Sequence, residues 1–527
     1  MKHPKSFDVV IVGSGFAGSL AASALQKQGK SVLLVDKGSH PRFAVGESST
    51  PLADMSLRRI AARYDLPWLE PLSRFGSWQK KYPTLLCGRK RGFTYVFHGK
   101  NHEKNPFLVA ASSSNESSDT QWFRQDVDRF LCDRAKDEGV TFWDFTEVLF
   151  CERQSATPGR EAQRRWQVTL MNKLGIQPIY TDWILDATGS GEFSSHHFDL
   201  QHSSDGFKTH TSAIYTHFEE MPLWFHQPNE YTYPPDFSAL HHMLDEGWIW
   251  MLRFENQRLS VGLVLEGVSN PSKEQWAQKE QWDPKEQWDQ VVARYPELEG
   301  FLLGRTQSAD LPAQWMTTGR LQRRANAAVG DGWVLLPHSY GFVDPMHSTG
   351  IAHTLHGVEQ VVDALLMDDS ASQTKRLESY QKALKKEIEL IDNVVALSLR
   401  TRHYPALFKA ATMAYFVCTV AAEREMIQQT QYSTTKATLV DESVHRIPSF
   451  LGADREDLQV MTRDVWKRVS SMTLKPDEMP DEERIRAAVQ DVIELIQPFD
   501  TIGLFDYNNE LDQWVVKTEI PHTAVSL

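Results

Sequence analysis

The sequence predicts an α/β fold that begins with a parallel sheet, and three observations in the first 36 residues support this prediction. Residues 7–12 form an apolar run rich in β-branched side chains, which is typical of a buried parallel strand. A G-x-G-x-x-G turn at 13–18 leads into an amphipathic helix predicted over 19–28. A second strand, 31–35, ends in Asp36, at the spacing of about 20 residues that a dinucleotide-binding unit of the Rossmann type requires.

The same stretch predicts which residues hold a dinucleotide. A pyrophosphate would bind the backbone N–H groups at the start of the helix, where the helix dipole favours an anion. Gly18 would let the helix pack close to the strand, and Asp36 would accept a hydrogen bond from a ribose hydroxyl. The predicted contacts in this unit are Gly13, Gly15, Phe16, Ala17, Gly18, Asp36 and Lys37.

The bulk composition limits the class of protein. The chain has 527 residues, of which 41% are hydrophobic and 24% charged, as in an ordinary globular protein. A net charge of -13 argues against a general nucleic-acid binder, which needs a basic face. The four cysteines form no CxxC pair, so we expect no zinc site, no other metal and a reducing compartment.

Two features of the sequence, its N-terminal segment and its longest apolar run, predict a cytoplasmic protein. The first strand begins so early that the sequence leaves no room for a signal peptide. The longest apolar run, 410–422, is shorter than the roughly 20 residues of a membrane span, so we expect a buried helix and no membrane contact.

A charged pair, Arg42 and Glu47, lies just past the nucleotide motif in a loop over 37–51. This loop is either a solvated surface segment or a strap over the cofactor. The G-x-G-x-x-G turn, the acid and the run H-P-R-F-x-x-G-E-S resemble the flavin-dependent halogenases, relatives of the single-component flavin monooxygenases. The resemblance implies that FAD is the dinucleotide and that Gly46, Glu47 and Ser48 lie against its isoalloxazine ring, with Arg42 beside them.

Arg124 stands in the run R-Q-D-V-D at a predicted helix start. It is either an ordinary surface charge or a contact to the cofactor, and the resemblance to the family's flavin-contacting segment favours the contact. The D-A-T-G run at 186–189 resembles the element that closes the nucleotide domain in this class of flavoprotein.

Three basic residues, Arg89, Lys90 and Arg91, stand together near the end of a predicted strand. Alternation along a strand puts Lys90 on the face opposite the two arginines. Only the lysine can lose its proton and act as an amine near neutral pH. A solvated strand end is the alternative, but if one of the three does chemistry, Lys90 is the candidate, and the segment resembles the lysine-bearing strand of the halogenases.

Trp248 and Trp250 are two residues apart, so on a strand they share a face and form a rigid aromatic wall. Core packing is the alternative. The run resembles the halogenase signature W-x-W-x-I-P without its Ile-Pro pair, which implies that the two indoles line the substrate cavity. The adjacent His241-His242 pair lacks further ligands at metal spacing, and we interpret it as structural.

The second informative stretch, 328–351, reads as a strand, a glycine-containing turn and a helix from about Thr349. Backbone donors at this helix start form a nest that suits an anion or a flavin edge. The run resembles the family's G-F-x-D-P-x-x-S-x-G, which implies halide binding at Thr349 and Gly350 and cofactor contacts from Asp344, Gly350 and Ile351. His347 stands where tryptophan-type halogenases carry Glu, which argues against tryptophan as the substrate and makes His347 a second catalytic candidate.

The predicted organisation is a Rossmann-type FAD-binding domain of the single-component flavin monooxygenase class, with a β-sheet substrate domain and a helical C-terminal region. The expected bounds are 1–200 and 320–370 for the FAD-binding domain, 201–319 for the β-rich domain, and 371–527 for the helical region. Within the halogenases, the K-R-x-F, R-Q-D-V-D and H-H-M motifs are most similar to the pyrrole-chlorinating branch of pyrrolnitrin biosynthesis.

The function implied by the resemblance is an FAD-dependent halogenase for an electron-rich phenol, pyrrole or indole. The resemblance implies FAD supplied reduced by a separate flavin reductase, O2, chloride or bromide, and transfer of hypohalous acid to Lys90. The substrate is a small molecule, free or tethered to a carrier protein. The alternatives are an FAD monooxygenase or reductase that uses NAD(P)H without halide, and a non-enzymatic flavin-binding protein.

Overall fold

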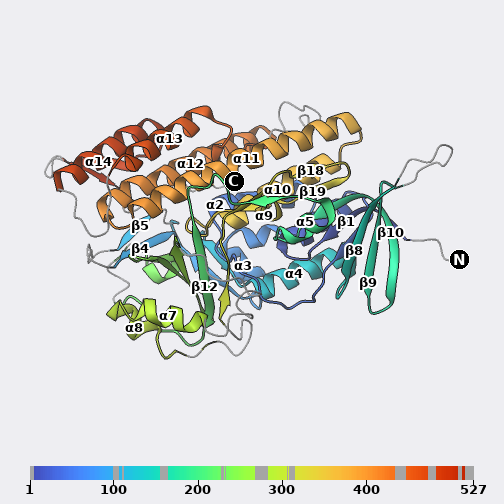
Figure 1. Cartoon of the computed structure of the whole chain (residues 1–527), viewed down its shortest axis with the longest axis horizontal. Coiled ribbons are helices and arrows are strands. Elements are labelled where there is room, and N and C mark those ends of the chain that lie inside the picture. The colour runs from blue at the N-terminus through green and yellow to red at the C-terminus, as the bar shows by residue number, and fades with distance from the viewer. Residues whose placement is uncertain are drawn as a thin grey trace.

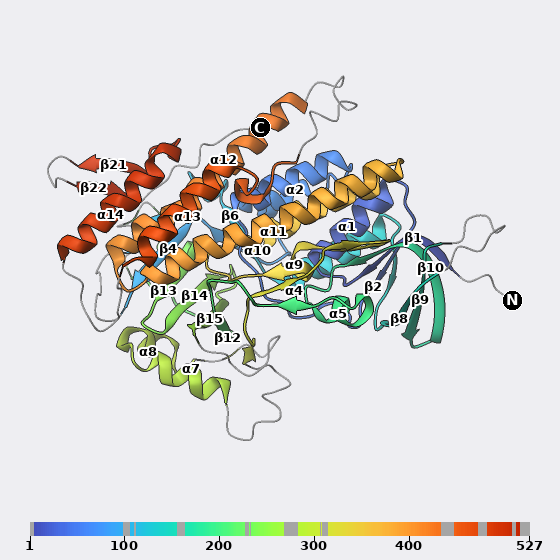
Figure 2. The same cartoon turned by 45° about the horizontal axis from the view of Figure 1, so that its top comes forward.

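A computed structural model of the chain describes residues 5–98, 106–109, 112–154, 164–226, 231, 233–267, 283–305, 307, 315–433, 447–472, 482–508 and 513–516. Two large sheets occupy the two halves of the protein, and long helices run along one side of both (Figures 1 and 2). The N-terminal strand lies at one end of the longest axis, beside the hairpin of β8, β9 and β10 (Figure 1).

The first sheet confirms the predicted parallel α/β unit. Its eight strands follow the order β18-β19-β10-β1-β2-β7, with β9 also paired to β10 and β8 to β9. Strand β1 pairs in parallel with β10 and β2, as β-branched strands buried on both faces do. Helix α1 starts at Phe16, three residues ahead of the predicted start, because Gly15 already takes the N-cap position. The strands are β1 (Ser6–Val12), β2 (Val32–Val35), β7 (Thr141–Trp143), β8 (Glu147–Arg153), β9 (Trp166–Asn172), β10 (Gly175–Asp186), β18 (Val329–Gly330) and β19 (Trp333–Leu335).

The second sheet has seven strands in the order β16-β12-β15-β14-β13-β4-β5. All its pairs are antiparallel except β13 with β4, which run parallel. Strands β4 and β5 come from ahead of residue 200, so this sheet draws on two separate segments of the chain. The strands are β4 (Phe93–Phe97), β5 (Phe107–Val109), β12 (Thr211–Phe218), β13 (Ala239–Met243), β14 (Gly247–Arg253), β15 (Leu259–Glu266) and β16 (Met316–Thr317).

Three small sheets accompany the larger ones. Strand β3 pairs with β6, strand β21 pairs with β22, and β11, β17 and β20 form a three-stranded sheet. The bounds are β3 (Cys87–Lys90), β6 (Asp119–Trp122), β11 (His202–Ser203), β17 (Arg323–Ala325), β20 (Gly341–Phe342), β21 (Phe505–Asn508) and β22 (Gln513–Val516).

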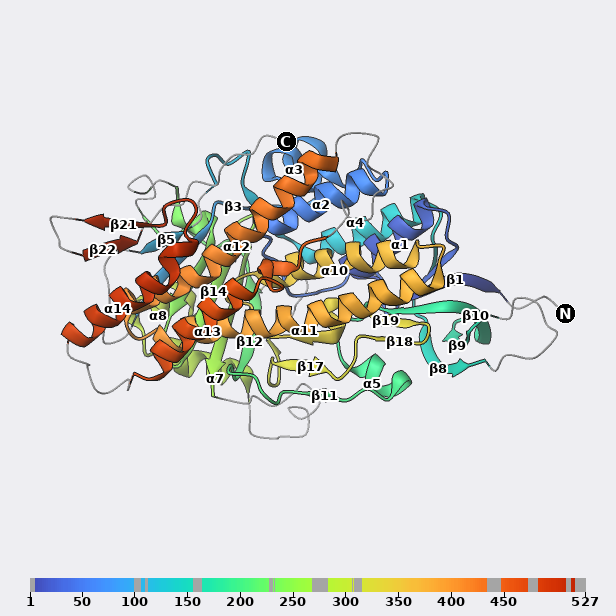
Figure 3. The same cartoon turned by 90° about the horizontal axis from the view of Figure 1, so that it is seen from above.

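The long C-terminal helices form one layer, and Figure 3 shows α11 and α12 running along the protein with α13 and α14 beside them at one end. Helix α12 is long and apolar enough to cross a membrane, but 72% of its most apolar window is buried inside the protein, as in a core helix. The helices are α1 (Phe16–Lys27), α2 (Pro51–Arg63), α3 (Phe75–Lys81), α4 (Arg124–Asp137), α5 (Glu192–Phe198), α7 (Pro284–Val292), α8 (Pro296–Leu302), α9 (Pro337–Tyr340), α10 (Thr349–Leu365), α11 (Ser370–Thr401), α12 (Pro405–Ser433), α13 (Glu456–Ser470) and α14 (Glu482–Ile496).

Two ion pairs join helix α2 to helix α10. Arg59 lies 3.0 Å from Glu359, and Arg63 lies 2.6 Å from Asp363. The hydroxyl of Tyr64 donates to Asp363 at 2.7 Å. Both carboxylates are buried, so removing one partner would leave a buried charge uncompensated, which is strongly destabilising. These contacts fix the C-terminal half of α10 relative to α2.

Gly262 on β15 lies opposite Trp250 on β14, and the indole covers it. A Cβ on Gly262 would lie 2.1 Å from the ring atom Cζ2 of Trp250. We expect Gly262→Ala to destabilise the protein by about 1–3 kcal/mol through overpacking, lowering Tm and changing tryptophan fluorescence. Gly300→Ala on α8 is the matched control, because a Cβ there meets no atom within 4 Å and should leave Tm unchanged or higher. Equal melting of the two variants would contradict this packing.

Candidate functional site

The glycine turn after β1 brings backbone into close contact. Gly13 has φ +104°, and a Cβ there would lie 2.6 Å from the carbonyl oxygen of Ala187. A Cβ on Gly18 would lie 1.9 Å from the carbonyl oxygen of Gly13, so only glycine lets α1 pack this close to the turn. Gly15 differs, because its nearest potential neighbours are side-chain atoms at 3.7 Å or beyond. These atoms belong to Asp128, Arg124 and Arg42, so two guanidinium groups stand beside the helix N-terminus, where the helix dipole favours a phosphate.

Asp36 ends β2 beside this turn. Its carboxylate accepts from the backbone N–H and the hydroxyl of Ser14 at 2.8 and 2.7 Å, and from the N–H of Gly38 at 2.9 Å. The half-exposed guanidinium of Arg42 lies 3.1 Å away. Burial acts to raise the pKa of Asp36, but Arg42 and these hydrogen bonds outweigh it, and the pKa is lowered. Asp36 is thus an ionised acceptor at the position where a ribose hydroxyl would arrive.

Arg124 at the start of α4 anchors the segment 45–49, which we call the strap. Its guanidinium donates to the backbone carbonyls of Val45 and Gly46 at 2.9 and 3.0 Å. Two further N–H groups bind the carboxylate of Asp128 in a bidentate pair, both at 2.8 Å. The guanidinium also lies over the ring of Phe16, 4.7 Å from its centroid. Arg124 therefore ties the strap to both α1 and α4.

The strap continues as an extra edge along β6. The N–H of Trp122 donates to the carbonyl of Glu47 at 2.5 Å. The N–H of Ser49 donates to the Thr120 carbonyl at 3.0 Å, and the N–H of Thr120 donates to the Ser49 hydroxyl at 3.1 Å. The side chain of Glu47 is buried, and its Oε1 lies 3.0 Å from Nε2 of His217 on β12. Neither carboxylate oxygen accepts a hydrogen bond from a described residue. Both oxygens of this buried carboxylate are therefore available as acceptors for a ligand.

The strap also contacts the start of helix α10. The hydroxyl of Ser348 donates to the hydroxyl of Ser48 at 3.0 Å, across 300 residues of sequence. Ser348 has φ +53°, the left-handed conformation, at the N-cap of α10. This local turn directs the first N–H groups of the helix, from Thr349 and Gly350, toward the strap side of the site.

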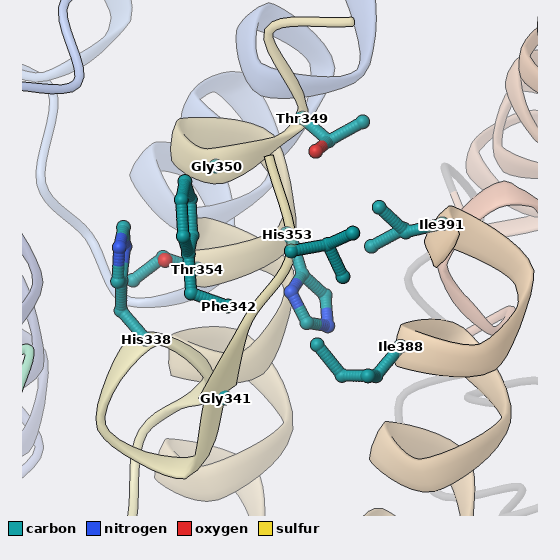
Figure 4. A pocket seen from close by; sticks show the side chains of 10 residues that line it. His338, Gly341, Phe342, Thr349, Gly350, His353, Thr354, Ile388 and Ile391 are labelled. Carbon is teal, nitrogen blue, oxygen red and sulfur yellow. The ribbon is translucent and has the colours of Figure 1, made fainter. Parts of the chain in front are cut away.

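A pocket opens beside the N-terminus of α10, and Figure 4 shows its walls. Thr349 and Gly350 line it together with His338, Phe342 and residues of α11. The rings of His338 and Phe342 stack with centroids 4.9 Å apart. Burial, together with the positive charges of nearby arginines that include Arg124, lowers the pKa of His338 to about 3. The pocket therefore lies in the field of the arginine that holds the strap, and His338 in its wall is neutral.

Lys90 is fully buried at the end of β3. Its amine donates to the backbone carbonyl of Ser49 in the strap at 2.6 Å and lies 4.1 Å from the centroid of the Phe93 ring. Burial lowers the pKa of Lys90 to about 7, against the opposing effects of Asp119 and Asp54. The predicted separation from the two arginines holds, because Arg89 pairs with Glu255 and Arg91 binds the Ser112 carbonyl, both away from the strap.

Trp248 and Trp250 are buried and lie side by side on β14, with ring centroids 6.0 Å apart. Trp248 contacts His241, and Trp250 contacts Tyr215 on β12 at 6.0 Å. Tyr215 in turn stacks on Phe43, two residues before the strap. The shared face predicted for the two indoles is present, and a continuous row of rings joins it to the strap.

His347 lies one residue before the N-cap of α10 and is fully buried. Its ring stacks on Tyr415 of α12 at 4.4 Å, and the Tyr415 hydroxyl donates to the His347 carbonyl at 3.0 Å. Its Nε2 contacts the hydroxyl of Ser398 at 3.1 Å. Burial lowers the pKa of His347 to about 3, so the ring is a neutral imidazole. The side chain is thus held by the C-terminal helices, which no local sequence pattern indicated.

The remaining predicted site residues differ in how deeply they are buried. Asp344 is buried and accepts from the Thr211 hydroxyl at 2.6 Å and the Met346 N–H at 3.0 Å. Burial raises the pKa of Asp344 to about 7. Ala17 and Ile351 are buried in the first turns of α1 and α10, and Lys37 is exposed beyond β2. Asp344 therefore braces the loop before α10 through its partners on both sides.

Sequence reasoning missed three residues of this site. His217 faces Glu47, His338 lines the pocket at α10, and His241 contacts Trp248. Strand alternation places His217 and Tyr215 on one face, which was the available signal, but a single strand does not show what that face meets. Among the described residues, no group of three or more His, Cys, Asp or Glu could hold a metal ion.

These residues fit FAD. The turn at Gly13 and Gly18 permits the close backbone approach that a pyrophosphate needs, and two guanidinium groups stand beside the helix N-terminus at Gly15. Asp36 is an acceptor at the end of β2, where a dinucleotide-binding unit would receive a ribose hydroxyl. The unsatisfied carboxylate of Glu47 and the N-terminus of α10 lie farther along the strap, where a flavin ring would extend.

Two family models match the chain. The NAD(P)-binding Rossmann-like domain matches residues 11–61, and the tryptophan halogenase model matches residues 182–449. Monodechloroaminopyrrolnitrin halogenase PrnC of Pseudomonas fluorescens is 28% identical over 495 residues, which cover 89% of this chain and 81% of that protein. Tetracycline 7-halogenase of Kitasatospora aureofaciens is 27% identical over 387 residues, 70% of this chain and 65% of that protein.

Solved structures show the same fold. Halogenase PltM superposes with a TM-score of 0.78 at 22% identity, covering 94% of this chain and 96% of that chain. Its complex with phloroglucinol and FAD gives a TM-score of 0.76 over 94% and 97% of the two chains. The halogenase family model alone matches half of the sequence, from the end of β10 through α12. The chain therefore belongs to the tryptophan halogenase family, whose members are FAD-dependent halogenases.

Proposed function

We propose that this enzyme halogenates an electron-rich aromatic small molecule, with Lys90 carrying the halogen from the flavin side of the protein to the ring. The observation that supports this most directly is the environment of Lys90. The amine is fully buried, its pKa is lowered to about 7, and it binds the carbonyl of Ser49 on the strap. A neutral amine is a nucleophile toward an electrophilic halogen, whereas an ammonium group is not.

FAD would be held along the path from α1 to the strap. Gly13, Gly15, Phe16, Ala17 and Gly18 would supply the pyrophosphate turn, and Asp36 with Lys37 would face the ribose. Arg42, Arg124 and the strap residues Gly46, Glu47 and Ser48 would hold the rest, with Asp344 and Ile351 supporting the α10 side. When bound and reduced, FAD supplies the O2 activation that converts halide to hypohalous acid. The residues of this chain bind, orient and shield that chemistry.

Halide would bind at the start of α10. Thr349 and Gly350 offer backbone N–H groups at a helix N-terminus, where the dipole favours an anion, and they line the pocket of Figure 4. Their partner Ser348 touches the strap through Ser48. The same nest would accept chloride or bromide, since both are monovalent anions.

Lys90 would carry the halogen in two steps. The amine lone pair attacks the halogen of hypohalous acid, an N–X bond forms, the O–X bond breaks, and the released hydroxide takes a proton from the nitrogen to give water. The ring carbon of the substrate then takes X from the nitrogen and loses its own proton, and the amine is restored. Trp248 and Trp250 would separate the substrate from the flavin, and His347 would act beside Lys90 at the substrate.

The partners follow from this chemistry. A separate flavin reductase would supply the reduced flavin, and the aromatic substrate would arrive free or tethered to a carrier protein. We place the enzyme in the cytoplasm, where reduced nicotinamide cofactors for such a reductase are made. The alternative, a monooxygenase or reductase that uses NAD(P)H directly, explains neither a buried Lys90 nor the paired indoles.

Gly15→Val tests the phosphate position. A Cβ at Gly15 meets no atom closer than 3.7 Å, and its φ of -64° suits any residue, so the variant should fold. The added methyl groups would occupy the space above the helix N-terminus, and FAD affinity should fall at least about tenfold, measured by flavin fluorescence. Gly300→Ala is the control. Retention of FAD at the wild-type level in a folded Gly15→Val protein would contradict the assignment.

Lys90→Ala tests the halogen-transfer role. With a flavin reductase, NADH, bromide or chloride and a panel of phenols, pyrroles and indoles, product should fall by about a hundredfold or more, read by mass spectrometry. Oxygen consumption with supplied reduced flavin should persist. Lys90→Arg should also fail, because a guanidinium keeps the charge but offers no amine nucleophile.

The control for the Lys90 variants is a change at the neighbouring Arg89, which is partly exposed. Arg89→Ala removes a pair with Glu255 that lies away from the strap, and it should halogenate normally. Wild-type halogenation by a folded Lys90→Ala enzyme would show that Lys90 is a buried structural charge and not the carrier.

The pH profile of halogenation should report the lowered pKa of Lys90. The amine is neutral above its pKa of about 7, so the ring-halogenation rate should rise with pH through about 7 and then level off. A second measurement, the pH dependence of Tm, does not depend on activity. An unfolded lysine keeps its proton up to about 10.5 while the folded one has lost it, so the Tm of wild type relative to Lys90→Met should increase as pH rises above 7. A rate that keeps rising to pH 10 would assign Lys90 an ordinary pKa.

A further inference from the structure

Four buried polar atoms near Lys90 have no hydrogen-bond partner among the described residues. They are Nδ1 of His241, Nδ1 of His347, the hydroxyl of Tyr95 and the indole Nε1 of Trp248. Their residues are at most 2% exposed. A buried donor or acceptor without a partner is costly, and native proteins rarely leave several together. Four such atoms in one region indicate a ligand that supplies the missing partners.

The four residues share one aromatic cluster, which we call the His241 cluster, although they come from β4, β13, β14 and the loop before α10. The His241 ring lies 4.8 Å from the Trp248 ring and 5.2 Å from the Tyr95 ring. Phe93 lies 6.0 Å from His241 and 6.3 Å from Tyr415, whose other face stacks on His347. The four residues that carry the unpaired atoms are therefore connected to one another through ring contacts.

Lys90 belongs to the same cluster. Its amine lies over Phe93, at 4.1 Å from the ring centroid. The Phe93 ring also contacts His241, and through Tyr415 it is connected to His347, so ring contacts link the amine to both histidines. Burial lowers the pKa of His241 well below its usual value, so its ring is neutral.

The hydrogen-bonding character of the atoms follows from their surroundings. Nε2 of His347 approaches the Val394 carbonyl at 3.4 Å and the Ser398 hydroxyl at 3.1 Å, and only a protonated Nε2 can donate to a carbonyl. Nδ1 of His347 is then the acceptor. His241 is also a neutral imidazole and offers one acceptor nitrogen. Trp248 offers one N–H donor and Tyr95 a hydroxyl. The cluster thus provides two imidazole acceptors where a substrate would bring donors.

We propose that His241, His347, Tyr95 and Trp248 form the recognition set for the substrate, and that the substrate is an electron-rich ring carrying at least two O–H or N–H donors. This inference rests on the proposed halogen transfer by Lys90, because it places the same ring within reach of that amine. An imidazole that accepts a hydrogen bond from a ring O–H or N–H draws electron density toward the ring carbons, which favours attack on halogen. His241 is therefore a substrate-binding residue and not a structural one.

The adjacent His242 supplies a matched control. It points to the opposite face of β13, where its Nδ1 lies 2.9 Å from Nε2 of His98 and its ring contacts Trp224. Its own Nε2 is unpaired, but it lies among the residues of the second core and not in the His241 cluster. A change at His242 alters the same strand and the same residue type without reaching Lys90.

The experiment compares two substrates that have the same benzene ring but differ in whether they carry hydrogen-bond donors. Resorcinol has two hydroxyl donors, and 1,3-dimethoxybenzene has the same oxygens without them. The two compete in one reaction with the holoenzyme, a flavin reductase, NADH and bromide, with methionine added to consume oxidant that escapes. The product ratio is divided by the ratio that free hypobromous acid gives in solution, so intrinsic reactivity cancels.

The wild-type enzyme should favour resorcinol by at least about tenfold over the free oxidant, because a site built to accept hydrogen bonds rejects an analogue that lacks the donors. His241→Phe, which preserves the ring packing, should bring the normalised ratio close to one. His242→Phe should keep the wild-type ratio. FAD content and Tm establish that each variant is folded.

The outcomes separate this inference from the proposed function. A normalised ratio near one for wild-type enzyme overturns the inference and leaves halogenation intact, and this comparison needs no variant to fold. An unchanged ratio in folded His241→Phe removes His241 from the recognition set. If wild-type enzyme brominates neither ring and a β-diketone trap detects no oxidised bromide, the proposed function itself fails.

Discussion

The clamp of Arg124 on the strap is the contact on which the rest of the site depends. One guanidinium holds two strap carbonyls, a carboxylate on its own helix and the face of Phe16. With the strap fixed, Glu47 meets β12, Ser48 meets the start of α10, and Ser49 holds the amine of Lys90. Three elements that are remote in sequence are thereby brought to one five-residue segment. A bidentate pair with Asp128 gives the arginine a single orientation, which a lysine in its place would lack.

Burial sets the chemical state of the groups around this segment. Desolvation disfavours charge, so it lowers the pKa of Lys90 to about 7 and the pKa of His347 to about 3. Asp36 responds differently, because Arg42 and three hydrogen bonds outweigh its burial. The nucleotide end of the path thus keeps an anion, while the aromatic end holds neutral bases. This division matches a chemistry in which a charged cofactor binds at one end and an uncharged aromatic ring at the other.

The sequence predicted the parts of the site that depend on local chemistry. The glycines of the first turn, the helix start at Arg124, the helix start at Thr349 and the shared face of Trp248 and Trp250 all follow from spacing and capping rules. Long-range pairing was not predictable. The parallel pairing of β4 with β13 brings Tyr95 opposite His241, and α12 brings Tyr415 onto His347. A strand pattern gives the face of His241 but not what that face meets, so its contacts with Trp248 and Tyr95 could not be predicted.

The contact between Ser48 and Ser348 also constrains how the protein is made. Together with the pairs of Arg59 with Glu359 and Arg63 with Asp363, it joins positions that are 300 residues apart. A chain emerging from the ribosome can form β1, α1 and β2 early, because these contacts are local. The strap and the start of α10 cannot meet until residues beyond 365 are synthesised, and His347 must then wait for Tyr415. During translation the nascent chain would therefore carry a nucleotide-binding turn well before it has a place for the ring chemistry, and capture of the cofactor would come as a late step of assembly.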